Sequence, residues 1–243
     1  MEILTVAIQK GGTGKTTTAA ALIQAAAYKG KKVLGIDLDP QGNLTFTLNA
    51  NKEKGGSSYD LLHGTAAADV IRHVSPLIDV IPAAWELSTE KTAKGSARRL
   101  QAALEPIKSD YDLIVIDTPP TAGELQYNAL QVATGLIIPL QADIYSLQSL
   151  YQITDTAKQM QQSNPALKIK GLILTRTDNR SSLARQMQEN IIVAANKIGV
   201  GYLGSIRTGI VIQEAAALQR SIFEYAPNSK PASDYLALFE QII

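Results

Sequence analysis

The chain has 243 residues, a net charge of +1 and 45% hydrophobic residues, an ordinary composition for a globular protein. It contains no cysteine, which excludes disulfides, thiolate chemistry and a cysteine-ligated iron–sulfur cluster. No apolar run approaches the roughly 18 residues that span a bilayer, and the first residues are typical of a strand, unlike those of a signal peptide. We therefore expect one cytoplasmic domain over residues 1–243.

The first elements surround a glycine-rich loop. A strand pattern at residues 3–8 precedes the loop, and an alanine-rich helical pattern at residues 16–28 follows it. This order is the context that a phosphate-binding loop requires, because glycines let backbone N–H groups turn toward phosphate oxygens at a helix N-terminus. The residues expected to bind a nucleotide are Lys10, Gly11, Gly12, Thr13, Gly14, Lys15, Thr16 and Thr17.

Two positions of this loop depart from the strict motif. Gln9 stands where a glycine is usual, and Lys10 adds a second lysine before the glycines. Lys15 is expected to reach the β- and γ-phosphates, and the Thr16 hydroxyl is expected to bind Mg²⁺. The pattern predicts nucleotide binding with Mg²⁺.

Strand and helix patterns alternate along the rest of the chain. Strand patterns lie at residues 33–38, 77–81, 113–116, 135–138, 169–175 and 202–206. Helical patterns lie at residues 59–62, from 86 onward, and at 98–107, 145–162, 183–197, 211–218 and 233–243. This alternation predicts an α/β fold in a single domain, with a mostly parallel, twisted sheet and helices on both faces.

Acidic residues follow two of the predicted strands, where ligands of such sheets bind. Asp117 ends the apolar run 113–116, which is the Walker B position for an Mg²⁺ ligand acting through water. Asp39 precedes Pro40 and is the candidate for orienting the attacking water. Asp37 ends the same strand pattern. Two simpler interpretations stay open, in which Asp117 caps the next turn and Asp39 forms an Asp-Pro turn.

These motifs resemble those of ParA-type, Soj-like partition ATPases of the deviant Walker A class, in the same superfamily as MinD. The similarity covers the glycine loop, residues 37–43 (DLDPQGN), 111–120 (YDLIVIDTPP) and 139–143 (PLQAD), with Tyr145, Ser146 and Leu150. Residues after 170 match more loosely, at 206–207, 214–215, 225–229 and Tyr235. The resemblance implies an Mg²⁺-dependent ATP hydrolase that is slow without a partner.

The resemblance also implies a dimer. In the family, ATP brings two subunits face to face, and the signature lysine, here Lys10, reaches the phosphates of the partner. It would act like an arginine finger, which is worth about 10³–10⁵ in rate in other phosphate-loop enzymes. Lys10, Lys15 and Asp39 are thus the expected catalytic residues, and Gly11 is expected where the two backbones approach. The family binds adenine near residues 206–208, which adds Arg207 and Thr208 to the nucleotide site and favours ATP over GTP.

DNA is the next expected partner. The family's ATP-bound dimer binds duplex DNA without sequence preference through basic side chains, which contact phosphates. Arg180 matches one such position, whereas a second basic position falls on the apolar pair Ile210 and Val211. We expect Arg220 to compensate, with Lys197 and Lys230 as further candidates.

Several alternatives concern cargo and location. The protein is expected to lie on the nucleoid and to be released when a ParB-like or other adaptor stimulates hydrolysis. Four kinds of cargo are expected as alternatives: a plasmid, a chromosome, a mobile element or a protein assembly. No helix-turn-helix region precedes residue 1, so the short form of the family is expected. A MinD-like membrane ATPase is disfavoured because no basic residue follows Lys230. An ATP-gated scaffold with negligible hydrolysis is the remaining alternative.

Overall fold

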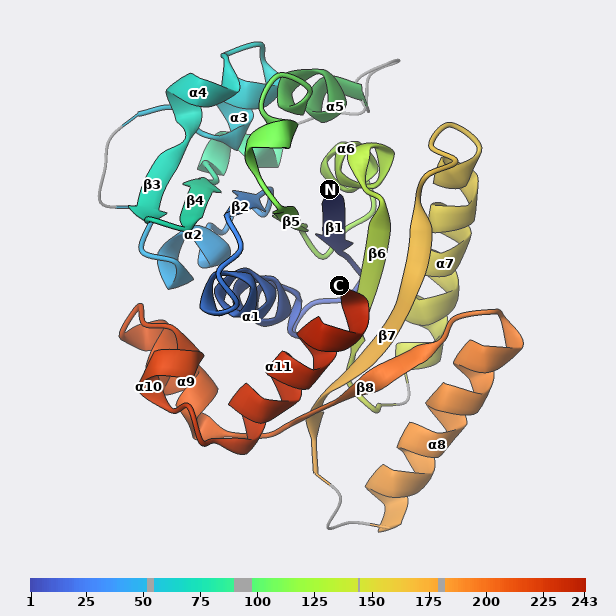
Figure 1. Cartoon of the computed structure of the whole chain (residues 1–243). Helices are drawn as coiled ribbons and strands as arrows, with labels where there is room; N and C mark the ends of the chain where they lie inside the picture. Colours follow the sequence, from blue (N-terminus) through green and yellow to red (C-terminus); the bar gives the residue numbers. More distant parts are fainter. Residues whose placement is uncertain (52–54, 90–97, 144, 179–181) are drawn as a thin grey trace.

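The computed structural model describes the whole chain apart from residues 52–54, 90–97, 144 and 179–181, and one eight-stranded sheet runs through it (Figure 1). The strand order is β3-β4-β2-β5-β1-β6-β7-β8, and every neighbouring pair is parallel except β3 with β4. The strands are β1 (Glu2–Val6), β2 (Val33–Asp37), β3 (Arg72–Ser75), β4 (Ile78–Ile81), β5 (Leu113–Asp117), β6 (Gly135–Leu140), β7 (Lys168–Thr177) and β8 (Tyr202–Arg207). The predicted α/β fold with a mostly parallel sheet is confirmed.

Helices cover both faces of the sheet, because successive side chains of a buried strand point to opposite sides. In β5, Leu113 and Val115 contact one core, and Ile114 and Ile116 contact another. The first face carries α1 (Lys15–Tyr28), α2 (Asn43–Thr47), α9 (Ile210–Ala217), α10 (Ile222–Tyr225) and α11 (Lys230–Ile242). Figure 1 shows α1 and α11 on this side and α6 and α7 on the other.

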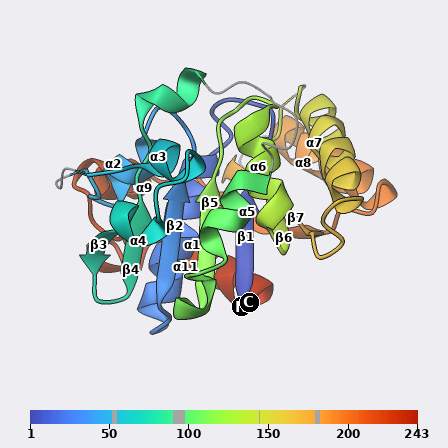
Figure 2. The same cartoon turned by 90° about the horizontal axis from the view of Figure 1, so that it is seen from above.

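The opposite face holds two separate hydrophobic cores. One lies under α3 (Ser58–Leu62), α4 (Ala67–Val70), α5 (Arg99–Leu104) and α6 (Glu124–Val132), and the other under α7 (Ser146–Gln161) and α8 (Ser182–Lys197). Figure 2 shows α3 to α6 grouped over β2 and β5, with α7 and α8 at the far end of the sheet. The described residues also include the 3₁₀ turns η1 (Trp85–Thr89) and η3 (Lys108–Asp110). Among the described residues no helix is long and apolar enough to span a membrane.

The sequence-based prediction lacks several elements of the described structure: the short helices α2, α4 and α10, the 3₁₀ turn η3, the helix α6 and the strand β3. The helix α6 was missed because Gln126 and Asn128 are polar yet fully buried, which hides the helical period. Asn128 Oδ1 accepts a hydrogen bond of 3.0 Å from Leu100 N, so its burial depends on a partner in α5. The strand β3 was missed because its sequence, Arg-His-Val-Ser, is that of a polar edge strand.

The strand register brings the candidate site together. In the parallel pairing, Val6 of β1 lies opposite Asp117 of β5, and Asp117 lies opposite Asp37 of β2. The loops that follow these three strands therefore leave the sheet at the same edge. That edge is the carboxyl edge, where parallel sheets bind their ligands.

Candidate functional site

The glycine loop runs from the end of β1 to the N-terminus of α1. Gly12 and Gly14 have φ angles of 73° and 88°, in the left-handed region that glycine adopts without strain. Gly14 is the N-cap of α1, and the first turn of the helix contains no acidic residue. A carboxylate therefore does not compete for the free N–H groups of this turn, so the geometry suits an anion at the helix N-terminus.

Lys15 lies at the base of the loop. The residue is buried, and its Nζ donates a hydrogen bond of 2.9 Å to the carbonyl oxygen of Lys10. Burial lowers the pKa of Lys15, while the charges of Asp117 and Asp39 act in the opposite direction. The amino group is thus bound to the backbone of the glycine loop and is influenced by the charges of two carboxylates. A phosphate group bound in the loop would add negative charge that stabilises this buried ammonium group.

Asp117 and Asp37 are both fully buried and lie opposite each other on adjacent strands. Asp117 Oδ1 accepts a hydrogen bond of 3.1 Å from Thr118 N, whereas its Oδ2 has no hydrogen-bond partner. Burial, followed by the charge of Asp37, raises the pKa of Asp117 well above its usual value; the Thr16 side chain opposes this shift. An unpaired carboxylate oxygen near a threonine hydroxyl is a donor set that fits Mg²⁺.

The sequence left open whether Asp39 and Asp117 form turns or bind a ligand, and the structure leaves room for both roles in each residue. Asp39 Oδ1 accepts a hydrogen bond of 3.0 Å from Gln41 N, which is the turn predicted for an Asp-Pro pair. Asp117 likewise holds the turn that begins at Thr118. In both residues the second carboxylate oxygen makes no hydrogen bond within the described part of the chain, so one oxygen fixes the turn and the other is available to a ligand.

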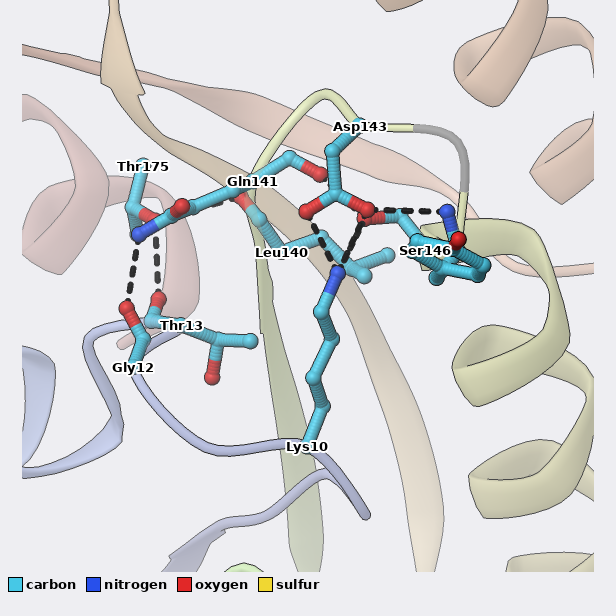
Figure 3. A network of polar contacts seen from close by, with 9 residues as sticks. Lys10, Gly12, Thr13, Leu140, Gln141, Asp143, Ser146 and Thr175 are labelled. Atoms are coloured by element: carbon cyan, nitrogen blue, oxygen red, sulfur yellow. Dashed lines mark hydrogen bonds and ion pairs between the residues drawn. The ribbon is translucent and has the colours of Figure 1, made fainter.

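Lys10 lies on the other side of the loop, against the segment between β6 and α7 (Figure 3). Its Nζ lies 2.5 Å from Asp143 Oδ1, also contacts Asp143 Oδ2, and lies 3.3 Å from Ser146 Oγ. The Lys10 hydrogen bond holds the pKa of Asp143 below its usual value, against the partial burial that alone would raise it. Within a single subunit, Lys10 is therefore paired with its own chain.

Two further side chains hold the glycine loop by its carbonyl oxygens (Figure 3). Gln141 Nε2 donates a hydrogen bond of 2.6 Å to Gly12 O, and Thr175 Oγ1 donates one of 2.8 Å to Thr13 O. Sequence reasoning noted residues 139–143 only as a motif and missed Thr175. The available signal was its position near the end of the β7 pattern, at the edge where the loop lies.

Gly11 differs from the other loop glycines. A Cβ built at Gly11 has no atom of the subunit within 4 Å, and its backbone does not need a left-handed φ. Nothing in the described subunit therefore requires glycine at this position. The space above Gly11 is open to a neighbouring molecule.

Arg207 and Thr208 lie where β8 ends. The Arg207 guanidinium makes an ion pair with Asp234, with Nη2 2.5 Å from Oδ1 and Nε 2.9 Å from Oδ2. Thr208 N donates a hydrogen bond of 3.2 Å to Thr177 O at the end of β7. The Arg207 side chain is thus engaged with α11, which leaves the backbone of this segment as the part available to a nucleotide base.

The predicted DNA-binding residues are only partly placed. Arg180 lies outside the described residues. Arg220 is exposed over the Tyr225 ring, 5.8 Å from its centroid, and borders a cavity of about 240 Å³ that Thr16 and Thr17 also line. Ile210, at the position where a basic residue was expected, is 68% exposed. Lys197 ends α8 and Lys230 begins α11, so these two candidates come from different helices.

Comparison with known proteins identifies the family of the chain. A family model described as an AAA domain matches residues 1–169. The chain is 36% identical to the sporulation initiation inhibitor protein Soj of Bacillus subtilis, over 99% of this chain and 98% of that protein. It is 35% identical to the chromosome partitioning protein ParA of Caulobacter vibrioides, over 100% of this chain and 94% of that protein.

Structures of a similar protein have been solved with bound nucleotide and magnesium. The cobyrinic acid a,c-diamide synthase of Mycobacterium smegmatis is 29% identical, with a TM-score of 0.84 over 99% of this chain and 93% of that one. It has been solved with ADP and magnesium and with an ATP analogue and magnesium. Because the identity to Soj and ParA exceeds 30% and extends over almost the whole chain, this chain belongs to the ParA/Soj family of partition ATPases.

Proposed function

We propose that this protein is an Mg²⁺-dependent ATPase that partitions DNA by switching between an ATP-bound dimer on DNA and a released form. The observation that carries the proposal is the convergence of three groups at one sheet edge: the buried Lys15, the unpaired Oδ2 of Asp117 and the turn-held Asp39. Phosphoryl transfer needs mainly positioning and electrostatic stabilisation, and these groups supply both.

Each residue has a distinct role in this proposal. Lys15 and the N–H groups of the α1 N-terminus bind the phosphates, while Thr16 and Asp117 hold Mg²⁺, which neutralises phosphate charge when bound. The free oxygen of Asp39 orients the attacking water. Lys10 leaves its own subunit and contacts the phosphates of the partner, adding positive charge where negative charge develops.

The open space at Gly11 supports a face-to-face dimer at this edge. The γ-phosphate is the ligand that distinguishes the two states, since only ATP supplies contacts to both subunits. The dimer binds duplex DNA through Arg180 and Arg220, and a ParB-like or other adaptor stimulates hydrolysis and release. This cycle places the protein on the nucleoid in the cytoplasm.

A protein cargo carried along the nucleoid is the second candidate, since the same switch would serve it. Docking on a membrane has less support, because the apolar side chains of α11 are used in the core. Tyr235, Leu238, Phe239 and Ile242 are all buried there against α1 and β8.

The test is retention on non-specific duplex DNA at low salt, measured with ATP, with ADP and without nucleotide, with dimerisation followed in the same samples. We expect ATP alone to give both a dimer and retention, and Lys10→Ala to lose both. Lys168→Ala, an exposed lysine at the opposite edge of the sheet, is the matched control and should behave as wild type. ATP-driven dimerisation without retention in any condition would contradict the DNA part of the proposal.

A further inference from the structure

The carboxylate of Asp37 closes the loop that contains Asp39. Asp37 Oδ2 accepts two hydrogen bonds from Thr45, one of 2.8 Å from its backbone N and one of 2.7 Å from its hydroxyl. Asp37 Oδ1 accepts a third, of 3.1 Å, from Asp39 N. The loop between Asp37 and Thr45 is therefore tied at both ends to one buried carboxylate, which fixes the position of Asp39.

The same threonine also holds a second segment of the chain. Thr45 Oγ1, which donates to Asp37, accepts a hydrogen bond of 2.9 Å from Ala83 N, just past the end of β4. Ser58 makes a parallel connection: its hydroxyl donates to Asp37 O at 2.7 Å, and its backbone N donates to Pro82 O at 2.8 Å. Two buried hydroxyl residues thus link Asp37 to Pro82 and Ala83.

The segment that starts at Pro82 borders the loops of the nucleotide site. Leu87 and Ser88 of η1 line a cavity of about 250 Å³ together with Pro40, which follows Asp39, and Pro119, which lies beyond Asp117. A change in the charge around Asp117 acts directly on Asp37, because the two buried carboxylates lie on adjacent strands in register. Binding of a phosphate and its cation at Asp117 would therefore change the strength of the hydrogen bonds that Asp37 accepts from Thr45.

We propose that Thr45 and Ser58 are positioning residues that hold Asp39 for hydrolysis and transmit nucleotide occupancy, through Asp37, to the segment that begins at Pro82. This inference rests on the ATPase function proposed above. Neither residue touches the reacting atoms; each acts through Asp37. Because a hydroxyl that both donates and accepts couples its two partners, loss of the Thr45 hydroxyl uncouples the two segments and loosens Asp39.

Trp85 provides a direct readout. It is the only tryptophan of the chain, it lies two residues beyond Ala83, and its side chain is 68% exposed. Its fluorescence therefore reports on the segment after Pro82, independently of hydrolysis.

The experiment measures kcat and KM for ATP and the ATP-induced change of Trp85 fluorescence in five proteins: wild type, Thr45→Val, Thr45→Ser, Ser58→Ala and Thr47→Val. Thr47 is the matched control, because its hydroxyl makes no hydrogen bond with the described residues and it lies on the same helix.

We expect Thr45→Val to lower kcat about tenfold or more with little change in KM, since small misplacements of reacting groups have effects of this size. It should also abolish the fluorescence change, whereas Thr45→Ser keeps both and Thr47→Val matches wild type. Ser58→Ala, which removes a single hydrogen bond and tests the inference even if Thr45→Val does not fold, should reduce both signals. The inference would be overturned, and the ATPase function left intact, if folded Thr45→Val had the kcat and the fluorescence response of wild type. If Thr45→Val fails to fold, the same result for Ser58→Ala would overturn it. Absence of hydrolysis in all five proteins would instead overturn the proposed function and, with it, this inference.

Discussion

The Lys10 amino group lies 2.5 Å from Asp143 Oδ1, so the lysine expected to reach a partner subunit is ion-paired within its own. Both side chains are partly exposed, at 22% and 38%, and such pairs are worth about 0.2–1 kcal/mol. The pair is therefore strong enough to bias Lys10 and weak enough to be broken when ATP supplies new partners.

Asp143→Asn should ease ATP-driven dimerisation. Asparagine removes the charge that holds Lys10 while keeping an oxygen for the hydrogen bond of 2.9 Å from Tyr145 N. The ATP concentration for half-maximal dimerisation, measured by light scattering, should fall by up to about fivefold, the equivalent of ~1 kcal/mol. Asp155→Asn, an exposed acid on α7, is the control. An unchanged or higher midpoint would show that the pair does not restrain Lys10.

Gly11→Val should separate nucleotide binding from dimerisation. The valine side chain meets no atom of its own subunit near its Cβ, so the fold and ATP affinity should be retained while a second subunit is blocked. Calorimetric titration of ATP and size-exclusion chromatography with light scattering measure the two properties. Gly201→Val, at another glycine with open space around it, should dimerise normally. Dimerisation of Gly11→Val would place the contact elsewhere.

Asp39→Ala should trap the ATP state. Removing the carboxylate leaves Lys15 and the phosphate loop in place, so ATP binding and dimerisation should persist while single-turnover hydrolysis slows by about 10²-fold or more. Asp110→Ala removes an exposed acid and should hydrolyse at the wild-type rate. Equal rates for Asp39→Ala and wild type would mean that the turn with Gln41 is the whole role of Asp39.

Charge reversal should identify the DNA surface. Arg180→Glu and Arg220→Glu should each weaken ATP-dependent DNA retention, and replacement of one phosphate-binding cation should reduce the salt slope by about one. Lys108→Glu, which reverses the charge of a lysine paired with Glu105 in η3, is the control and should leave retention unchanged. Full retention by either arginine variant would remove that residue from the DNA-binding surface.

The buried Asp37 should make the nucleotide-free protein less stable as pH rises. Burial raises the pKa of Asp37 to about 6, so the folded state holds a proton that the unfolded state releases near pH 4. Stability therefore decreases as pH increases from about 4 to 6, in the direction opposite to that of a salt-bridged carboxylate. Thermal melts in this range should show a shallower decrease for Asp37→Asn; identical slopes would contradict the shift.

Periodicity and motif spacing determined most of the fold. The prediction for residues 113–116 corresponds to β5 (Leu113–Asp117), and that for residues 16–28 corresponds to α1 (Lys15–Tyr28). Such elements are predictable because their signals are local: a continuous apolar run for a covered strand, and alanine-rich sequence for a helix. The glycine loop and the acidic strand ends were predicted for the same reason, since each motif lies within a few residues of one strand.

Tertiary structure alone decided the contacts that join these motifs. Asp143 lies 133 residues from Lys10, and Thr175 lies 162 residues from Thr13, so no local pattern indicates either pair. The link from Asp37 through Thr45 to Ala83 likewise depends on which strands are neighbours in the sheet. Sequence determines which side chains stand at the ends of strands; the strand order and register determine which of them come within hydrogen-bonding distance.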